Sequence, residues 1–320
     1  MPINTLLEVP ASAASAADAP HLRPSESTLA RFLEQRGRRI FRACGATWYA
    51  APCRFLMSLP YQAMLDPDPA ELRHLIREAR MLGVRFPAIA WTGLESGLYV
   101  LRRREYEIES VHPKHRPRVR RGLQTFDIRL ASAQELMAQG LALNLNTMAR
   151  QGRYDPEFGE KRRWQTLVEA AFSCPGVSVP AAFVGSRLAA YMVTCREHGW
   201  LHILHQMSRQ EDLPNFPNHV LTYSVTRQAL GDPALEAVCY GYVPLFAADG
   251  LHEYKLRFGY EMVPHRSAIQ LHPAVGRALD NRAAHLGLRC LRAIRAADQR
   301  LETIDTVLKG ASASRTETRA

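Results

Sequence analysis

The order of the predicted elements between residues 126 and 272 is the feature that most constrains the fold. A strand in "TFDIRLAS" (residues 125–132) is followed by two helices, three strands, a loop that leads into a helix, one strand, one helix and closing strands. Runs between turn residues indicate the strands, and apolar residues at helical spacing indicate the helices. This order predicts an α+β domain with a mixed, mostly antiparallel sheet flanked by helices.

Local signals mark where several of these elements begin and end. Ser132 and Glu135 form the capping-box pattern at the start of the first helix. Turns at Gly185 and Gly199 divide residues 177–208 into an antiparallel meander of three strands. The second helix is expected to present one apolar face, which consists of Trp164, Leu167, Val168, Ala171 and Phe172.

The segment "GLHEYKLRFGYEMVPH" (residues 250–265) predicts a helix, a glycine stop and a strand in immediate succession. Gly259 lets the chain leave the helix through a positive φ, and Phe258 anchors the turn in the core. Tyr254 and Lys255 are neighbours on the helix, so their side chains point about 100° apart. We therefore expect only one of the two to face a site, and Tyr254 is the preferred candidate.

The first 125 residues predict a second, weaker series of elements. Residues 29–44 have apolar side chains at roughly helical spacing, and residues 47–60 have the pattern of short strands broken by prolines. Asp68 as the N-cap and Pro69 at the first helical position predict a helix that ends at Gly83. Two extended runs follow before a strongly charged stretch.

Positive charge dominates the chain. Its 320 residues carry a formal net charge of +10. A balance of this sign favours an anionic partner such as a phosphorylated cofactor, a nucleic acid or a membrane surface. Basic residues are most concentrated at Lys114, Arg116, Arg118, Arg120 and Arg121. This cluster fits either a solvated helix start or a patch that binds phosphate or RNA.

Several classes of protein are not expected. No run of about 18 uncharged apolar residues is present, so we expect no transmembrane helix. The six cysteines are scattered without a CxxC motif or a Cys/His cluster. They predict reduced, mostly buried thiols in a cytoplasmic protein without a metal site. His202 and His205 do not change this expectation, because residues three apart on a strand face opposite sides.

The order of elements, together with four segments, resembles the GNAT acyltransferase fold. The segments are "HPKHRPRVRRGL" before the first strand, "VGSRLAAYMV" in the meander, "PNHVLTYSVTRQAL" at the central helix and "GLHEYKLRFGY" near the end. The resemblance is to the branch with Fem-type peptidyltransferases, in which two GNAT-like halves lie in one chain. It implies a disordered tail at 1–27, a degenerate GNAT-like or accessory subdomain at 28–125, a GNAT acyltransferase domain at 126–272 and a helical extension with a tail at 273–320.

The resemblance implies that coenzyme A binds where the strand before the central helix parts from its neighbour. The helix then aims its N-terminal amides at the pyrophosphate, with Asn218 as the expected N-cap. The residues implied for the cofactor are Met207, Ser208, Arg209, Pro217, Asn218, His219 and Val220. The loop at residues 208–218 departs from the usual pattern, because it lacks two glycines and carries Glu211 and Asp212. Fem-like members commonly lack these glycines as well.

The resemblance also implies catalytic roles. Acyl transfer to an amine needs a group that takes a proton, a donor to the oxyanion and an acid for the leaving group. Tyr254 matches the tyrosine that serves as the acid in many GNAT enzymes, with Tyr240 or Tyr242 as rivals. His205 is a further candidate near the acyl site.

We therefore expect an N-acyltransferase that passes an acyl group from acyl-CoA or acetyl-CoA to the amine of a small molecule, peptide or protein. The amine would attack directly in a ternary complex, with Lys255, Arg116 and Arg120 binding the substrate. Two alternatives stay open: a Fem-like transferase that uses aminoacyl-tRNA, held in part by the arginine cluster, and a non-catalytic GNAT-like protein that binds RNA or a partner. The apolar side of the C-terminal helices suggests a homodimer.

Overall fold

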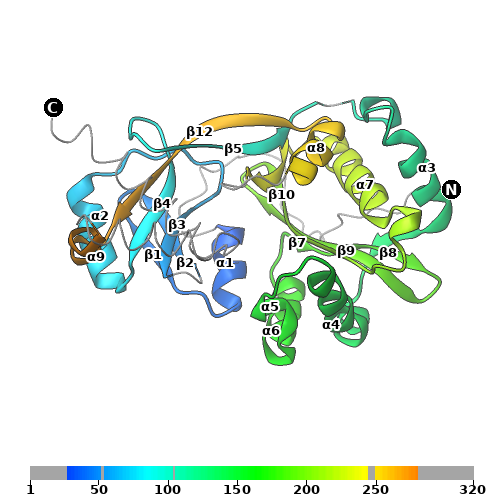
Figure 1. The fold of residues 1–320 in the computed structure, drawn as a ribbon, viewed down its shortest axis with the longest axis horizontal. Coiled ribbons are helices and arrows are strands. Elements are labelled where there is room, and N and C mark those ends of the chain that lie inside the picture. Colours follow the sequence, from blue (N-terminus) through cyan, green and yellow to red (C-terminus); the bar gives the residue numbers. More distant parts are fainter. Residues whose placement is uncertain (1–26, 52–53, 104, 244–248, 280–320) are drawn as a thin grey trace, which may run out of the picture. The chain divides into compact units, whose positions relative to one another are not determined.

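The computed structural model describes residues 27–51, 54–103, 105–243 and 249–279 (Figure 1). The chain divides into two compact units. Unit 1 consists of Met1–Gly37, Tyr99–Gly241 and Ala248–Met262, and unit 2 consists of Arg38–Leu98, Tyr242–Ala247 and Val263–Ala320. The strands that contribute residues to both units are β5 (Leu94–Leu101), β11 (Ala237–Tyr242) and β12 (Glu261–Leu271).

Unit 1 is built on strands in the order β6, β8, β9, β10 and β11, with β7 beside β9. The bounds are β6 (Asp127–Leu130), β7 (Val177–Ser178), β8 (Pro180–Val184), β9 (Arg187–Glu197) and β10 (Trp200–Ser208). β10 and β11 run parallel, whereas β6–β8, β8–β9 and β9–β10 are antiparallel. The predicted mixed, mostly antiparallel sheet is therefore confirmed.

Helices cover both faces of these strands. Helices α4, α5 and α6 lie on one side, and α3 and α7 lie on the other (Figure 1). The bounds are α1 (Thr28–Gln35), α3 (Arg116–Thr125), α4 (Ala133–Arg150), α5 (Pro156–Gly159), α6 (Lys161–Ser173), α7 (Pro217–Gly231) and α8 (Asp249–Arg257), with 3₁₀ turns η2 (Ile108–Ser110) and η3 (Leu213–Asn215). The α4 side encloses a core whose largest members are Phe32, Phe158, Trp164, Phe183 and Tyr191.

Unit 2 contributes its own strands and has its own core. It contains β1 (Ile40–Ala43), β2 (Ala46–Ala50), β3 (Phe55–Leu59), β4 (Gly83–Ala88), α2 (Pro69–Ala79) and α9 (Pro273–Leu279). The first three strands form an antiparallel meander, and α2 connects β3 to the parallel strand β4. Leu72, Leu75 and Ile76 of α2 join Trp48 and Phe86 in a separate hydrophobic core.

The elements expected in the second part of the chain are confirmed. The meander corresponds to β8, β9 and β10, with Gly185 and Gly199 in its turns at φ angles of 59° and 76°. The segment with the glycine stop forms α8 and β12. Gly259 adopts a φ of 86° between them, and Phe258 is fully buried. The closing stretch is a single strand rather than several.

The helix expected over residues 29–44 is too long. It ends at Gln35, because the chain turns at Gly37, whose φ is 78°. Ile40 and Phe41, which fit the helical spacing, lie in β1 instead. Helical and strand spacing coincide over a few residues, so the glycine was the better guide to this boundary.

The helix at Asp68 begins as predicted but ends earlier. The Asp68 carboxylate accepts hydrogen bonds from the amides of Ala70 and Glu71. The helix ends at Ala79 because Arg80 adopts the left-handed conformation (φ 56°, ψ 45°). Glycine is the usual residue in a left-handed position after a helix. The helix was therefore predicted to continue to Gly83, the next glycine in the sequence.

Two other predictions need comment. Phe172 does not belong to the apolar face of α6, because 43% of it is exposed, whereas the other four residues of that face are buried. The disordered tail and the C-terminal helices proposed as a dimer contact lie mostly outside the described residues, which contain only Ser27 of the first and α9 of the second.

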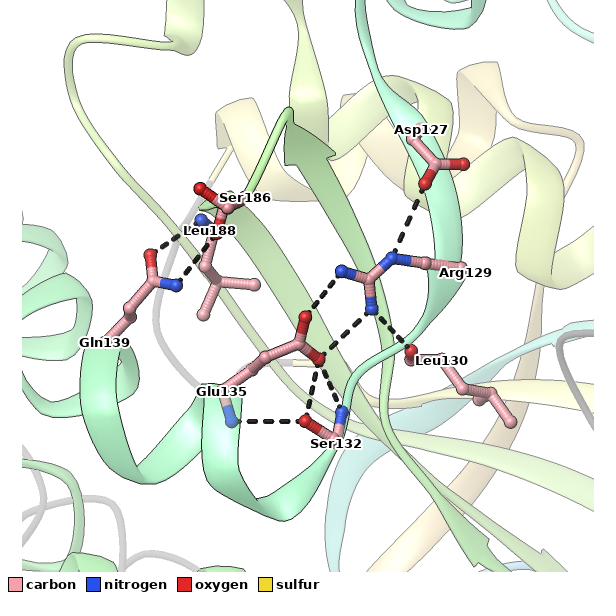
Figure 2. A network of polar contacts seen from close by, with 8 residues as sticks. All are labelled: Asp127, Arg129, Leu130, Ser132, Glu135, Gln139, Ser186 and Leu188. Carbon is pink, nitrogen blue, oxygen red and sulfur yellow. Dashed lines mark hydrogen bonds and ion pairs between the residues drawn. The ribbon is translucent and has the colours of Figure 1, made fainter.

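The predicted capping box at the start of α4 is part of a larger polar network (Figure 2). The Ser132 hydroxyl accepts from the Glu135 amide, and the Glu135 carboxylate accepts from the Ser132 amide. The same carboxylate accepts two bonds from Arg129 on β6, at 3.1 and 2.5 Å. These bonds from Arg129 lower the pKa of Glu135 to about 2. The network therefore ties the start of α4 to the first strand of unit 1.

We predict that Glu135→Gln, which keeps a capping group, destabilises the protein by about 1 kcal/mol at pH 7. The lowered pKa stabilises the fold fully above pH 4.5, and this contribution is lost as the pH falls from 4.5 towards 2. Urea unfolding of the wild type and the variant should therefore converge at acid pH. Glu169→Gln, at an exposed position on α6, is the control. A difference that does not depend on pH would contradict the ion-pair interpretation.

Candidate functional site

The site is formed where β10 and β11 part from each other. They pair only from Trp200 to His202 on β10 and from Ala237 to Cys239 on β11. Beyond that point Leu204 is an extra residue in the pairing with β9, which makes a β-bulge. The ends of both strands are thus free to line a cavity, as the sequence analysis expected.

A cavity of about 770 Å³ occupies this position. Its lining comes from the end of α4 and the residues after it, from β10, from the start of α7, from the end of β11 and from α8. Three cationic side chains contribute, Arg150, Arg153 and Lys255. Hydroxyl and amide groups come from Thr147, Gln206, Ser208, Asn218, Tyr240 and Tyr254. Such a lining suits a polar ligand that carries negative charge.

Lys255 is buried to an unusual degree for a lysine, with only 5% of its surface exposed. Its Nζ donates to the carbonyl oxygen of Tyr240 at 2.6 Å and lies 4.2 Å from the ring centre of Tyr99. Burial removes water from the ammonium group and lowers its pKa to about 8. Lys255 is therefore mostly protonated at neutral pH, but it can lose its proton under mild conditions.

Tyr254 also lines the cavity, so the two neighbours on α8 both reach it. The expectation that only one of them faces a site was wrong, because Lys255 is long enough to extend towards β11. The Tyr254 hydroxyl donates to the carbonyl of Asn218 at 2.9 Å and lies 2.9 Å from the hydroxyl of Thr222. Burial raises the pKa of Tyr254 well above its usual value, so the phenol stays neutral.

Tyr240 and Gln206 form a second polar pair in the cavity. The Tyr240 hydroxyl donates to Oε1 of Gln206, and burial raises the pKa of this tyrosine to about 12. The amide nitrogen of Gln206 donates to the backbone carbonyl and the side chain of Asn218, at 3.2 Å each. The pair therefore links the end of β11 to the first turn of α7.

Two histidines in the cavity are neutral. His205 packs edge-on against Phe158, with ring centres 4.6 Å apart, and burial lowers its pKa to about 3. His219 lies edge-on to Tyr254 at 5.2 Å, and burial lowers its pKa to about 3 as well. Groups with pKa values this low accept protons poorly near pH 7. The catalytic role expected for His205 stays a prediction.

The start of α7 differs from the expectation. Phe216 is the N-cap, in the left-handed conformation (φ 61°, ψ 49°), and Pro217 takes the first helical position. Asn218 is therefore already inside the helix. Its side-chain nitrogen donates to the Ser208 hydroxyl at 3.0 Å, so it closes the loop rather than capping the helix.

Several backbone amides of the loop between β10 and α7 donate hydrogen bonds within the protein. The amides of Arg209, Gln210, Leu213, Asn215 and Phe216 all donate to oxygens of the protein. Asp212 is buried and accepts two bonds from the Arg187 guanidinium, at 2.5 and 2.7 Å. A pyrophosphate cradle needs amides that point at the ligand. Five amides of this loop are therefore already used within the protein, and the coenzyme A site expected from the sequence stays a prediction.

The structure brings many of the predicted site residues together. Those that line the cavity are His205, Ser208, Pro217, Asn218, His219, Tyr240, Tyr254 and Lys255. Met207 and Val220 are core residues instead, with 2% and 0% of their surface exposed. Arg209 is held away, because its Nε donates to the carbonyl of Leu188 at 2.8 Å. These three residues are outside the lining.

Arg116 and Arg120, expected to bind the substrate, are also outside the lining. The Arg116 guanidinium donates to the carbonyls of Val111 and Glu109, at 2.8 and 2.6 Å, so it holds the turn before α3. Arg120 is exposed and lies 3.9 Å from the Glu109 carboxylate. In contrast, Arg150 and Arg153 were missed, because arginines at a helix C-terminus are common and have no distinctive spacing.

Neither a metal-binding cluster nor a membrane-spanning helix is found among the described residues. The bulge at Leu204 breaks the alternation that was expected to separate His202 from His205. Even so, the described residues contain no group of three or more His, Cys, Asp or Glu side chains that could hold a metal ion. No helix within the described ranges has the length and apolar character needed to cross a membrane.

We predict that Lys255 titrates near pH 8. The chain has only four lysines, Lys114, Lys161, Lys255 and Lys309, so reductive methylation with ¹³C-formaldehyde gives few NMR signals. The signal that is lost in Lys255→Arg should titrate at least about one pH unit below that of exposed Lys161. Equal midpoints for the two signals would mean that Lys255 is hydrated.

The comparisons with known proteins address the fold. No family model and no curated protein matches the chain. Among solved structures, FemX is similar with a TM-score of 0.55 and 10% identity, over 79% of this chain and 93% of that one. The C-terminal domain of a protein named as a lysylphosphatidylglycerol synthetase, from Agrobacterium fabrum, is similar with a TM-score of 0.54 and 13% identity, over 80% and 91%. The chain therefore has the GNAT fold that was expected from the sequence, and it shares this fold with these two structures.

Proposed function

We propose that the protein transfers an aminoacyl group from the 3′ end of a tRNA to an amine. The amine nitrogen attacks the ester carbonyl carbon, a C–N bond forms, and the bond between that carbon and the ribose oxygen breaks. The amine gives up a proton, and the ribose oxygen gains one. The products are an amide and a tRNA with a free hydroxyl group, so atoms and electrons balance without a further reactant.

The observation that carries this proposal is the loop before α7. Five of its amides are already bonded within the protein, and the loop carries the buried carboxylate of Asp212, which would oppose the approach of a phosphate. Acyl-CoA, the donor first expected from the sequence, is therefore less favoured than the aminoacyl-tRNA that the sequence also left open. The two similar structures, FemX and a domain of a protein named as a lysylphosphatidylglycerol synthetase, support a transferase that handles aminoacyl groups.

Lys255 is the residue best suited to assist the chemistry. Its ammonium group has three N–H donors, of which the Tyr240 carbonyl takes one. The remaining donors can stabilise the oxyanion of the tetrahedral intermediate or the departing ribose oxygen. Tyr254 is less suited than the sequence suggested, because its hydroxyl already donates to the Asn218 carbonyl. In this proposal Tyr254 positions α8 against α7.

Arg150 and Arg153 provide charge at the α4 side of the cavity. Arg150 lies 3.4 Å from the Ser208 hydroxyl, and Arg153 donates to Gln151 at 2.6 Å. Neither forms an ion pair with a carboxylate among the described residues. Their charge is therefore available to a phosphate of the donor or to an anionic group on the acceptor.

The donor class can be tested by thermal unfolding. We predict that total tRNA charged with amino acids raises the melting temperature by roughly 5 °C at about 100 times its Kd. Acetyl-CoA at the same concentration should leave it unchanged. Stabilisation by acetyl-CoA, with none by charged tRNA, would overturn the proposal in favour of an acyl-CoA transferase. Absence of both effects would favour a non-catalytic protein.

We predict that Lys255→Met lowers the rate of aminoacyl transfer by about 10²-fold to 10³-fold. The donor in this assay is ¹⁴C-labelled aminoacyl-tRNA, and the acceptor is a mixture of glycylglycine, L-lysine and ethanolamine. The wild-type rate, relative to that of Lys255→Arg, should fall as the pH rises through 8, since the guanidinium stays charged. Lys161→Met is the control on an exposed helix surface. If the ratio of the wild-type rate to the Lys255→Arg rate is constant between pH 6.5 and 9.5, the charge of Lys255 takes no part in the reaction.

A further inference from the structure

Helix α3 carries a basic ridge, defined here as Lys114, Arg118 and Arg121. These positions are four and three residues apart, so they share one side of the helix and the turn before it. All three side chains are exposed. The adjacent side of the helix, with Val119 and Gly122, is buried. The ridge thus faces solvent while the helix is firmly packed.

The ridge lies beside the cavity of unit 1. Gly122 meets α7 so closely that an added Cβ would lie 2.7 Å from Cβ of Val220. The Arg118 guanidinium stacks 5.4 Å from the ring centre of Phe216, which itself lines the cavity. Arg121 donates to the side chain of Asn215 at 3.1 Å. Two arginines of the ridge therefore contact the segment that forms one wall of the cavity.

The charge of the ridge is not neutralised within the described part of the chain. None of its three side chains forms an ion pair with a described carboxylate. The neighbouring Arg120 forms a long ion pair with Glu109, at 3.9 Å, and the Arg116 guanidinium donates hydrogen bonds to backbone carbonyls. Three unpaired cations on one exposed surface give a local positive potential that attracts an anionic partner.

We propose that the ridge binds the phosphate backbone of an RNA and directs its 3′ end past Phe216 into the cavity. This inference rests on the proposed function and adds the surface that holds the body of the tRNA. Arginine and lysine side chains on a helix suit phosphates, which are spaced regularly along a strand. Because the contacts involve phosphates rather than bases, the ridge would bind tRNAs of different sequence.

An RNA fits the ridge better than a membrane surface does. A helix that lies on a membrane inserts a broad apolar face between the lipids. The apolar residues of α3 are used against α7, and Leu123, which is 39% exposed, is the large apolar side chain that remains accessible on this helix. The other exposed residues of this helix are Pro117, three arginines and Gln124, which do not form an apolar stripe that could enter a bilayer.

The test compares a full tRNA with its 3′ end alone. The double variant Arg118→Gln/Arg121→Gln should bind charged tRNA at least about tenfold more weakly than the wild type at 0.1 M KCl. The slope of log K against log[KCl] should decrease by about two, one for each phosphate contact. Binding of an aminoacylated CCA trinucleotide should not change. The double variant Lys161→Gln/Arg162→Gln, which removes two exposed charges from α6, should behave like the wild type, and equal melting temperatures of all three proteins exclude misfolding.

Each other outcome has a definite meaning. If the ridge variant binds tRNA as the wild type does, with the same salt slope, the ridge is not the RNA surface, although the proposed function stands. If the variant instead loses binding to vesicles of dioleoylphosphatidylglycerol, with tRNA binding unchanged, the ridge binds a membrane and this inference is overturned. If neither tRNA nor the trinucleotide binds the wild type, the proposed function itself fails.

Discussion

The separation of β10 from β11 is the constraint on which the site depends. A parallel pair that ends after three residues leaves the following backbone groups without partners, and buried groups of this kind must be satisfied elsewhere. Lys255 satisfies the carbonyl of Tyr240 on β11, and the side chain of Gln206 on β10 bonds to the carbonyl of Asn218 in α7. Polar groups that line the cavity therefore also provide partners for the chain beyond the end of the strand pairing.

This arrangement accounts for the buried charge of Lys255. An ammonium group loses several kcal/mol of hydration when it is buried, and one carbonyl bond does not replace all of it. The rings of Tyr99 and Tyr240 provide partial compensation, with centres 4.2 and 4.8 Å from Nζ. The remaining cost appears as the lowered pKa. A ligand with negative charge would stabilise the desolvated ammonium group. The desolvation that lowers the stability of the free protein would therefore increase its affinity for such a ligand.

The fold could be predicted from the sequence to a greater extent than the site. Ser132, Gly185 and Gly259 act through local backbone chemistry, so the elements that they bound were recognised. Helix ends without such a residue were misplaced, as at Arg80, which takes a left-handed conformation that arginine seldom adopts. Tyr254 and Lys255 were identified through a resemblance, but their hydrogen-bond partners depend on how α8 packs against α7 and β11. Arg150 and Arg153 enter the cavity only through long-range packing, which leaves no signal in their spacing.

The arginine cluster shows why a sequence alone could not separate structural charge from functional charge. Arg116 and Arg118 are two residues apart and look equivalent in the sequence, yet Arg116 is bonded to two carbonyls and Arg118 lies over Phe216. Gly122 lets α3 approach α7 closely, so that one side of the helix is buried. That contact places the basic ridge next to the start of α7, which forms one wall of the cavity. A partner held by the ridge would therefore be held in register with the cavity.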